Sequence, residues 1–472
     1  MKKAVCLCLI FWILAGCWIL PVSAEPQQNA DPSVTSGCKT LDAVAPVLGT
    51  GSLITNAEAV FLYEINTQTL MYSYNADHSM YPASLVKMLT ALIAVEKGNL
   101  SDIVTVKEDV IATVPYDAVS ADLQAGEMMS LDNLLYCMMV DSANDAAAVI
   151  ADHICGSQGA FVEEMNRYAQ EIGCTGTTFK NVHGIHDDEQ VTTARDMAKI
   201  LAVALKNEVF QSLLQTVYYT VPATNLSQER KLSSGNFLMN NQDSMQIYYD
   251  SRVTGGRTGV TDDGGRCLAV TATNGDLEYI SIIMGAQSVY EEDGYTVRSF
   301  GGFNETTQLL DIGFHGYHTA QILFENQILK QYPVVDGNNS VSAGCKEAVS
   351  VVLPEGVTIE DLTFTYNDLN AQLTAPVAKD QALSGVTVWY KNNCIAHTEI
   401  YAMNAVMAQT SVVGQPDSTD SAGKWKTVLL VIVSILVLLS GVFFAVRIVK
   451  RLRITAARSR SRRYRRNRRR SR

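Results

Sequence analysis

Apolar and polar residues alternate along this chain with two different periods, one typical of strands and one of helices. Residues 59–75 alternate around a turn at Asn66, which predicts a β-hairpin. The positions that follow have helical spacing, and we expect helices over 82–96, 128–140, 146–154, 158–172 and 193–206. Residues 231–290 have the pattern of strands again. A sheet formed from both ends of this region, with helices inserted between them, predicts an α/β layered fold.

The helical spacing is absent after about Gly316. Short alternating segments separated by turns continue to Ala402 and predict a small all-β domain. We therefore expect an α/β domain over residues 56–315 and a β-rich domain over 316–405. A Pro-, Ser- and Thr-rich lead-in is expected over 25–55, and residues 406–427 are typical of a flexible linker.

Both ends of the chain carry targeting signals. Residues 1–24 combine a charged start, an apolar run and a small-x-small cleavage site, which predicts a secretory signal peptide. Cys17 offers an alternative, lipoprotein-type cleavage site. Residues 428–446 are apolar and long enough to span a bilayer, at ~1.5 Å per residue against ~30 Å of hydrocarbon. The tail over 447–472 holds fourteen Arg and Lys and no acid, so we expect it in the cytoplasm and the rest of the chain outside, anchored to the cell membrane.

Charge is divided unevenly between these parts. The 472 residues carry a formal charge of −11, and removing the +14 of the tail and the +2 of Lys2 and Lys3 leaves −27 for residues 25–446. An acidic exported region disfavours nucleic acid as its partner, whereas the basic tail is expected to contact anionic lipid. Seven cysteines remain after signal removal, and no Cys-x-x-Cys pair marks a zinc or redox site.

Candidate chemistry begins at the head of the 82–96 helix. Pro82 suits a first helical turn, so we expect Ser84 among free backbone N–H groups and Lys87 on the same face three residues later. The apolar run that follows predicts a core helix, in which burial favours the neutral amine of Lys87. A hydroxyl beside such an amine is a nucleophile–base pair. The spacing alone is weak, because residues 36–39 and 421–424 share it.

A polar break between two predicted helices supplies the next candidates. Ser142 and Asn144 lie in this break, where side chains can project into a cleft and relay a proton. Their spacing is also weak alone, because residues 73–75 and 234–236 share it. Arg257 lies on a later strand edge, where a cation can hold a carboxylate and neighbouring glycines let a substrate backbone approach.

Three motifs, in this order, resemble those of penicillin-binding proteins and serine β-lactamases: Ser84-Leu-Val-Lys87, Ser142-Ala-Asn144 and Arg257-Thr-Gly259. The segments between them are similar to the D-alanyl-D-alanine carboxypeptidases, over roughly residues 55–405. The resemblance implies a penicillin-binding-protein-like domain, with an antiparallel sheet, helices and a helical insert. A small all-β domain and a C-terminal transmembrane helix would follow it.

The resemblance also implies a reaction without a cofactor. The penultimate D-Ala of a peptidoglycan stem peptide, or a β-lactam, acylates the serine, terminal D-Ala leaves, and water hydrolyses the acyl-enzyme. The residues implied as catalytic are the nucleophile Ser84, the base Lys87, the proton relay Ser142, and Asn144, which orients the lysine and the acyl amide. Those implied to bind the substrate carboxylate or the oxyanion are Arg257, Thr258, Gly259 and Val260.

One position departs from the family, because Arg257 stands where lysine is usual. Arginine cannot shuttle a proton, but it can still grip a carboxylate. Two alternatives stay open: a β-lactamase, although no Glu-x-x-x-Asn segment occurs over 173–184, and a peptidoglycan-binding pseudoenzyme with reduced catalysis. No metal is expected; His183 and His186 are ligand-type side chains, but no geometry supports four ligands.

Overall fold

A computed structural model describes residues 54, 56–242, 246–293, 297–368, 372–409, 429–443 and 446–448. The predicted signal peptide, nearly all of the lead-in and most of the linker and basic tail lie outside these residues, as do Cys17 and the two further Ser-x-x-Lys spacings. The chain divides into two units, Met1–Ala408 and Gln409–Arg472, which are described separately.

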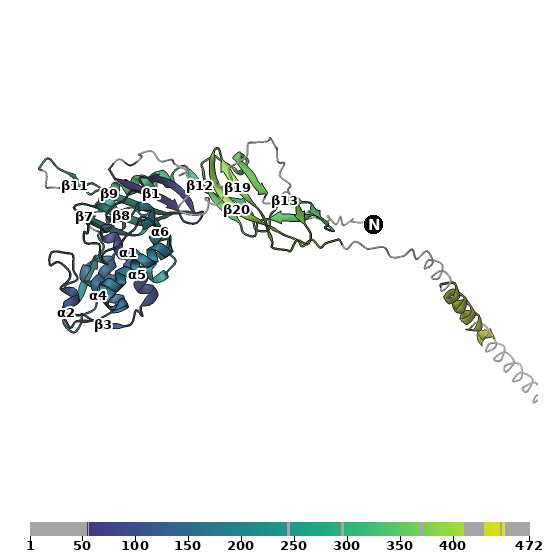
Figure 1. Ribbon diagram of the computed structural model, residues 1–472, viewed down its shortest axis with the longest axis horizontal. Coiled ribbons are helices and arrows are strands. Elements are labelled where there is room, and N and C mark those ends of the chain that lie inside the picture. Colours follow the sequence, from purple (N-terminus) through teal and green to yellow (C-terminus); the bar gives the residue numbers. More distant parts are fainter. Residues whose placement is uncertain are drawn as a thin grey trace, which may run out of the picture. The chain divides into compact units, whose positions relative to one another are not determined.

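A five-stranded antiparallel sheet forms the centre of the first domain (Figure 1). Its strands, in spatial order, are β2 (Thr69–Tyr74), β1 (Ala59–Glu64), β9 (Leu277–Ala286), β8 (Gly265–Asn274) and β7 (Val253–Thr261). The predicted hairpin and the return of the chain to the sheet are both confirmed. β7 is an edge strand, so one side of its backbone has no neighbour within this sheet.

Both faces of the sheet are covered. Phe61 of β1 points into a core shared with the helical region, whereas Leu62 points into a second core with α8. This alternation explains why all six residues of β1 are buried. The helices are α1 (Val86–Lys97), α2 (Glu108–Ile111), α3 (Leu131–Val140), α4 (Asn144–Cys155), α5 (Gln158–Glu171), α6 (Ala194–Ala204), α7 (Glu208–Gln215) and α8 (Phe303–Phe314).

Three predicted helix starts were wrong. The helix expected from Pro82 begins at Val86, because Ala83–Leu85 forms the 3-10 turn η2. The helix expected from residue 128 begins at Leu131, because Met128–Ser130 pairs as strand β4 with β3 (Ile103–Thr105). The Ser130 hydroxyl accepts from Asn133 N and caps the helix instead. The helix expected from residue 146 begins at Asn144, so the polar break is shorter than predicted. Neither α7 nor α8 was predicted.

The prediction of a small all-β domain is confirmed. Its main sheet has the spatial order β13 (Ile328–Tyr332), β15 (Val341–Gly344), β20 (Asn393–Ala402), β19 (Ala382–Tyr390) and β17 (Leu362–Asp368). β12 (Tyr317–Leu323) pairs with β16 (Val349–Pro354). The remaining short elements of the chain are strands β5 (Tyr218–Val221), β6 (Arg230–Ser233), β10 (Val289–Tyr290), β11 (Val297–Ser299), β14 (Val334–Val335) and β18 (Leu373–Thr374), and 3-10 turns η2 (Ala83–Leu85), η3 (Phe237–Met239), η4 (Gln246–Tyr248) and η5 (Ile359–Asp361).

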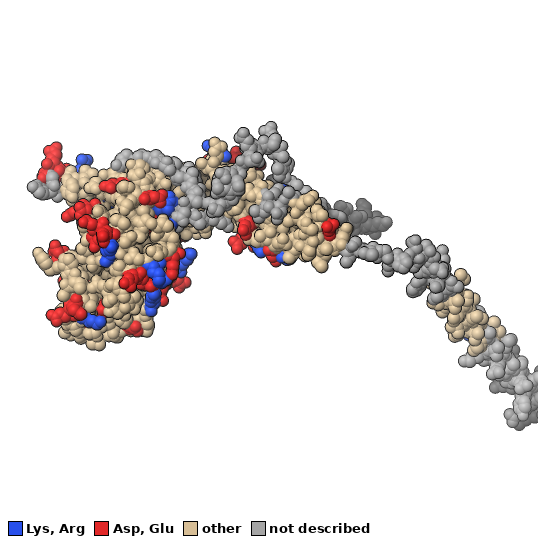
Figure 2. All heavy atoms as spheres, in the orientation of Figure 1, with Lys and Arg blue, Asp and Glu red and all other residues tan. Residues whose placement is uncertain are grey.

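The second unit contains one apolar helix among its described residues, Leu429–Ile448. Its mean hydropathy is 3.0, and it is long and apolar enough to cross a membrane. In the first unit, acidic and basic side chains interleave over the face drawn in Figure 2 rather than gathering into a basic surface.

A buried ion pair joins the segment before β4 to strand β6. The Arg230 guanidinium donates to both carboxylate oxygens of Glu127, at 2.7 and 2.9 Å, and its Nε donates to Ala121 O at 2.8 Å. Glu127 has no exposed side-chain surface, and Arg230 is 12% exposed. This pair holds in place a loop that borders the site described below.

Replacing Arg230 with methionine is expected to destabilise the domain by about 3 kcal/mol, because it leaves the Glu127 carboxylate buried without a counter-charge. Urea unfolding of residues 56–408 measures the effect. Lys231→Met is the matched control, since Lys231 lies on the same strand with its side chain 80% exposed. Equal, small changes in both variants would contradict the assignment.

Candidate active site

Ser84 lies in a single 3-10 turn that leads directly into α1. The preceding residue, Ala83, has a φ of +48°, a conformation that side chains rarely adopt outside functional sites. Gly184 packs against this turn, where a Cβ would lie 2.0 Å from Ala83 O and 2.9 Å from Ser84 N. Only glycine fits at position 184, and its contact fixes the backbone of the serine.

Lys87 follows one turn later and has no exposed surface. Its Nζ lies 3.1 Å from Ser84 Oγ, donates to Asn144 Oδ1 at 2.8 Å and donates to the backbone carbonyl of His183. Burial, and secondarily the charge of Arg257, lower the pKa of Lys87 well below its usual value, against an opposite effect of Asp145. The prediction that Lys87 is desolvated is therefore confirmed.

The hydrogen-bond partners of Lys87 Nζ are those that a neutral amine requires. A neutral amine has two N–H groups and one lone pair. Asn144 Oδ1 and His183 O can only accept, so they take the two N–H groups. The lone pair is left to face the hydroxyl of Ser84, and the amine is oriented to receive its proton.

Ser142 and Asn144 lie at the junction of α3 and α4. Ser142 has a φ of +67°, and its Oγ donates to Ser84 Oγ at 3.2 Å. Asn144 N and Nδ2 both donate to Val119 O at 2.9 Å. Because a carbonyl can only accept, this contact fixes which end of the amide is Nδ2, so Oδ1 must face Lys87.

The Arg257 side chain extends from β7 to Ser142, the serine that contacts Ser84. Its Nη1 donates to Met139 O at 2.8 Å, near the end of α3, and its Nη2 donates to Ser142 Oγ. The side chain is 3% exposed, and burial lowers the pKa of Arg257 to about 10, so it stays charged at neutral pH. The hydrogen bonds therefore run in one direction, from Arg257 through Ser142 to Ser84.

The exposed end of β7 brings the other predicted residues close to the serine. A Cβ on Gly259 would lie 2.7 Å from Ser84 N, so the two backbones are in contact. Thr258 lies beside Gly235, and Val260 is 53% exposed. The structure thus brings residues from all three predicted motifs together at Ser84.

The groups that sequence reasoning missed are mostly backbone carbonyls. Val119 O, Met139 O and His183 O each hold a polar side chain of the site, yet any residue supplies a carbonyl, so no sequence pattern marks them. Asp145 was also missed. It accepts from Ser120 Oγ at 2.7 Å, Ala121 N at 2.9 Å and Leu123 N at 3.0 Å, and so anchors the loop that carries Val119.

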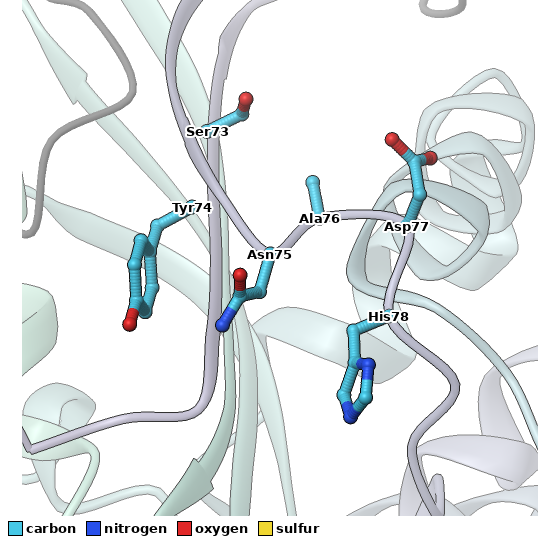
Figure 3. A pocket seen from close by; sticks show the side chains of 6 residues that line it. All are labelled: Ser73, Tyr74, Asn75, Ala76, Asp77 and His78. Carbon is cyan, nitrogen blue, oxygen red and sulfur yellow. The ribbon is translucent and has the colours of Figure 1, made fainter.

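The other two Ser-x-Asn spacings lie at different places, one at the opposite edge of the sheet and one beside β7. Residues 73–78 line an open pocket of about 450 Å³ (Figure 3) at the β2 edge of the sheet. Four strand spacings of ~4.8 Å separate this edge from β7. Asn75 Nδ2 donates to Glu58 O, a structural contact. Asn236 lies near β7, but its side chain accepts from Leu238 N in a turn.

The two histidines of the 183–186 loop do not share a ligand. His183 is buried, and burial and the nearby Lys87 lower the pKa of His183 to about 3, so its ring is neutral and accepts from Ile185 N. His186 is partly exposed and contacts two carboxylates. Within the described ranges, no group of three or more His, Cys, Asp or Glu is arranged to hold a metal ion.

Comparison with known proteins gives consistent matches. The family model described as D-alanyl-D-alanine carboxypeptidase matches residues 49–288, and the model described as penicillin-binding protein 5, C-terminal domain, matches residues 317–408. D-alanyl-D-alanine carboxypeptidase DacC of Escherichia coli (strain K12) is 30% identical over 360 residues, which cover 74% of this chain and 84% of the relative. DacF of Bacillus subtilis (strain 168) is 26% identical over 361 residues, covering 75% of this chain and 86% of the relative.

A solved structure agrees with these matches. Penicillin-binding protein 5 from Haemophilus influenzae superposes with a TM-score of 0.63 at 27% sequence identity, covering 76% of this chain and all of the other. The penicillin-binding-protein-like fold expected from the motifs, an α/β domain followed by a β domain, is thereby confirmed.

Removing the charge of Arg257 is expected to move the reactivity of Ser84 to higher pH. Arg257→Gln relieves part of the repulsion that lowers the pKa of Lys87. The pKa of Lys87 then rises, and at a given pH less of the amine is neutral. The midpoint of the rise in acylation rate with pH should therefore move upward.

A fluorescent penicillin, followed from pH 5 to pH 9, measures this midpoint. Arg257→Lys keeps a cation at the position and should leave the midpoint near that of the wild type. Arg266→Gln removes a cation from the neighbouring strand β8 and should not move it. An unchanged midpoint in Arg257→Gln would show that burial alone sets the charge of Lys87.

Proposed function

Since the chain belongs to the D-alanyl-D-alanine carboxypeptidase family, as a serine-type hydrolase of cell-wall metabolism, we propose that it removes the terminal D-Ala of peptidoglycan stem peptides through an acyl-enzyme on Ser84. The single observation that carries the assignment of the nucleophile is the position of Ser84 Oγ, within hydrogen-bonding distance of both Lys87 Nζ and Ser142 Oγ. β-Lactams would acylate the same oxygen.

Acylation begins with transfer of the Ser84 proton to the lone pair of Lys87. The serine oxygen attacks the carbonyl carbon of the penultimate D-Ala, and the N–H groups of Ser84 and Val260 stabilise the oxyanion. The lysine ammonium formed in this step has three N–H groups. Its three neighbours, Asn144 Oδ1, His183 O and the serine oxygen, can accept all of them.

Collapse of the tetrahedral intermediate requires a proton on the leaving amine of D-Ala. Ser142 donates its hydroxyl proton to this nitrogen and recovers one from the Lys87 ammonium, so the C–N bond breaks without forming an amide anion. Arg257 does not take part in this exchange, since a guanidinium does not release its proton at neutral pH. Water then attacks the ester carbonyl as the serine oxygen did in acylation. Ser84 is now the leaving group, and the ester is hydrolysed.

The terminal carboxylate of the substrate lies near Arg257 and Thr258 in this proposal. Each Nη atom of Arg257 donates one of its two N–H groups to a protein group, and its Nε is buried without a partner among the described residues. We propose that Arg257 attracts the carboxylate through its charge and its remaining Nη N–H groups, and that the Thr258 hydroxyl donates a hydrogen bond to it. The free edge of β7 would pair with the peptide backbone.

Ser84→Ala is expected to abolish both D-Ala release from a peptide ending in D-Ala-D-Ala and covalent labelling by fluorescent penicillin. The variant removes the atom that forms the ester, so a loss of at least about a thousandfold is expected. Full-length protein in detergent and an assay of free D-Ala measure it. Ser73→Ala is the matched control, because Ser73 belongs to the open pocket at the opposite sheet edge.

The same experiment separates the alternatives. Rapid turnover of penicillin by the wild type would favour a β-lactamase, and failure of both reactions would favour a peptidoglycan-binding pseudoenzyme. If only Arg257→Lys releases D-Ala, the charge of the arginine does not replace the family's lysine.

We also propose that the helix Leu429–Ile448 anchors the chain in the cell membrane, with the catalytic domain outside and the basic tail in the cytoplasm, where it contacts anionic lipid. Ending the chain at Ala408 is expected to release active protein into the medium, since the apolar helix is then missing. Fractionation and D-Ala release measure this. An active truncated chain that still sediments with membranes would contradict the proposal.

A further inference from the structure

The loop between Phe179 and Val191 is part of the active site through its backbone. The carbonyl of His183 accepts from Lys87, and Gly184 packs on Ala83 O beside the nucleophile. The loop is shaped internally by Asn181, whose Oδ1 accepts from Gly184 N at 2.7 Å and whose Nδ2 donates to Ile185 O at 2.8 Å. The position of this loop against its neighbours therefore affects the base and the nucleophile together.

His186 is the side chain with which this loop contacts two other segments. Its ring lies edge-on to Tyr81, with centroids 4.7 Å apart and planes at 73°. Its Nε2 lies 3.1 Å from Asp188 Oδ1 within the loop, and 3.5 Å from Asp263 Oδ2 in the turn between β7 and β8. The proposed reaction assigns no role to this histidine.

The three segments that meet at His186 also carry groups of the proposed active site. Tyr81 leads to Ser84 N, the turn of Asp263 follows Val260 N, and the loop supplies the acceptor for Lys87. The turn and the Tyr81 segment also touch directly, since a Cβ on Gly264 would lie 3.1 Å from Tyr81 Cβ. A change of attraction at His186 would therefore act on the two segments that carry the oxyanion donors.

We propose that His186 is a positioning residue for acylation, and that its charged form draws the loop, the Tyr81 segment and the β7–β8 turn together. This inference rests on the proposed function of Ser84. The groups that face the ring are Asp188 from its own loop, Asp263 from the turn and Tyr81 from the segment before the nucleophile.

One nitrogen atom between two carboxylates explains the dependence on charge. Both carboxylates can only accept, so Nε2 must carry a hydrogen. The neutral ring has a single N–H that serves one carboxylate, whereas the positive charge of the imidazolium attracts both. Protonation of an imidazole is favoured at lower pH, so this attraction is stronger at lower pH.

The test compares the second-order acylation rate of full-length variants by fluorescent penicillin at pH 6 and pH 8.5. His186→Gln keeps an N–H donor but no charge. It is expected to be slower than the wild type by about two- to fivefold at pH 6, as for a partly exposed ion pair, with a smaller difference at pH 8.5. His186→Arg keeps the charge and should be faster than the wild type at pH 8.5.

His153→Gln is the matched control, because His153 makes a similar contact of 3.2 Å with Asp102 at the end of α4. It should leave the rate unchanged at both values of pH. Asp263→Asn removes the partner on the turn and should reproduce the pH dependence of His186→Gln, which keeps the test valid if that variant fails to fold.

The experiment distinguishes failure of the proposed function from failure of the inference about His186. If the wild type forms no Ser84-dependent adduct, the proposed function is wrong. If it forms the adduct and the ratio of wild-type to His186→Gln rates is the same at both values of pH, the function stands and the charge of His186 has no positioning role.

Discussion

The burial of the Lys87 amine is the constraint on which the rest of the site depends. An amine without exposed surface exchanges water for protein partners, and an uncompensated charge there costs several kcal/mol even after relaxation. The structure supplies three partners, none of them a carboxylate, and places a second cation nearby. The amine is therefore held neutral and oriented, which is the state that a proton acceptor needs.

Each partner of the amine is itself held by a different part of the chain. The Asn144 amide is oriented by Val119 O, and the loop that carries Val119 is anchored by Asp145. The His183 carbonyl is held by the contact of Gly184 with the turn of the nucleophile. The geometry at one nitrogen atom thus requires the helical region, the loop after α5 and the sheet to be correctly packed, so stability and activity depend on the same contacts.

Sequence reasoning predicted the parts of this arrangement that follow from local spacing. Ser84 and Lys87 are three residues apart on a buried helix, and periodicity alone indicates that they share a face. The hairpin of β1 and β2 and the all-β domain also follow from alternation. What brings Ser142 and Arg257 to the serine is tertiary packing, and their predicted grouping came from resemblance rather than from spacing.

The failures of prediction also have a physical pattern. Met128–Ser130 has helical spacing but pairs with β3, because a strand partner distant in sequence overrides local preference. The carbonyls of Val119, Met139 and His183 have no side-chain signature at all. His186 was considered as a metal ligand, because its residue type is visible in the sequence while its neighbours, Tyr81 and Asp263, are not.

The arginine at position 257 supplies the buried site with a cation whose charge is fixed at neutral pH. Arg257 keeps its charge because its pKa, even when lowered by burial, stays near 10, and this charge in turn disfavours protonation of Lys87. The resting site then has one fixed cation beside Ser142 and one free base beside Ser84. A carboxylate that enters this site would meet a positive charge without removing the lone pair of Lys87, because the fixed cation and the free base are separate side chains.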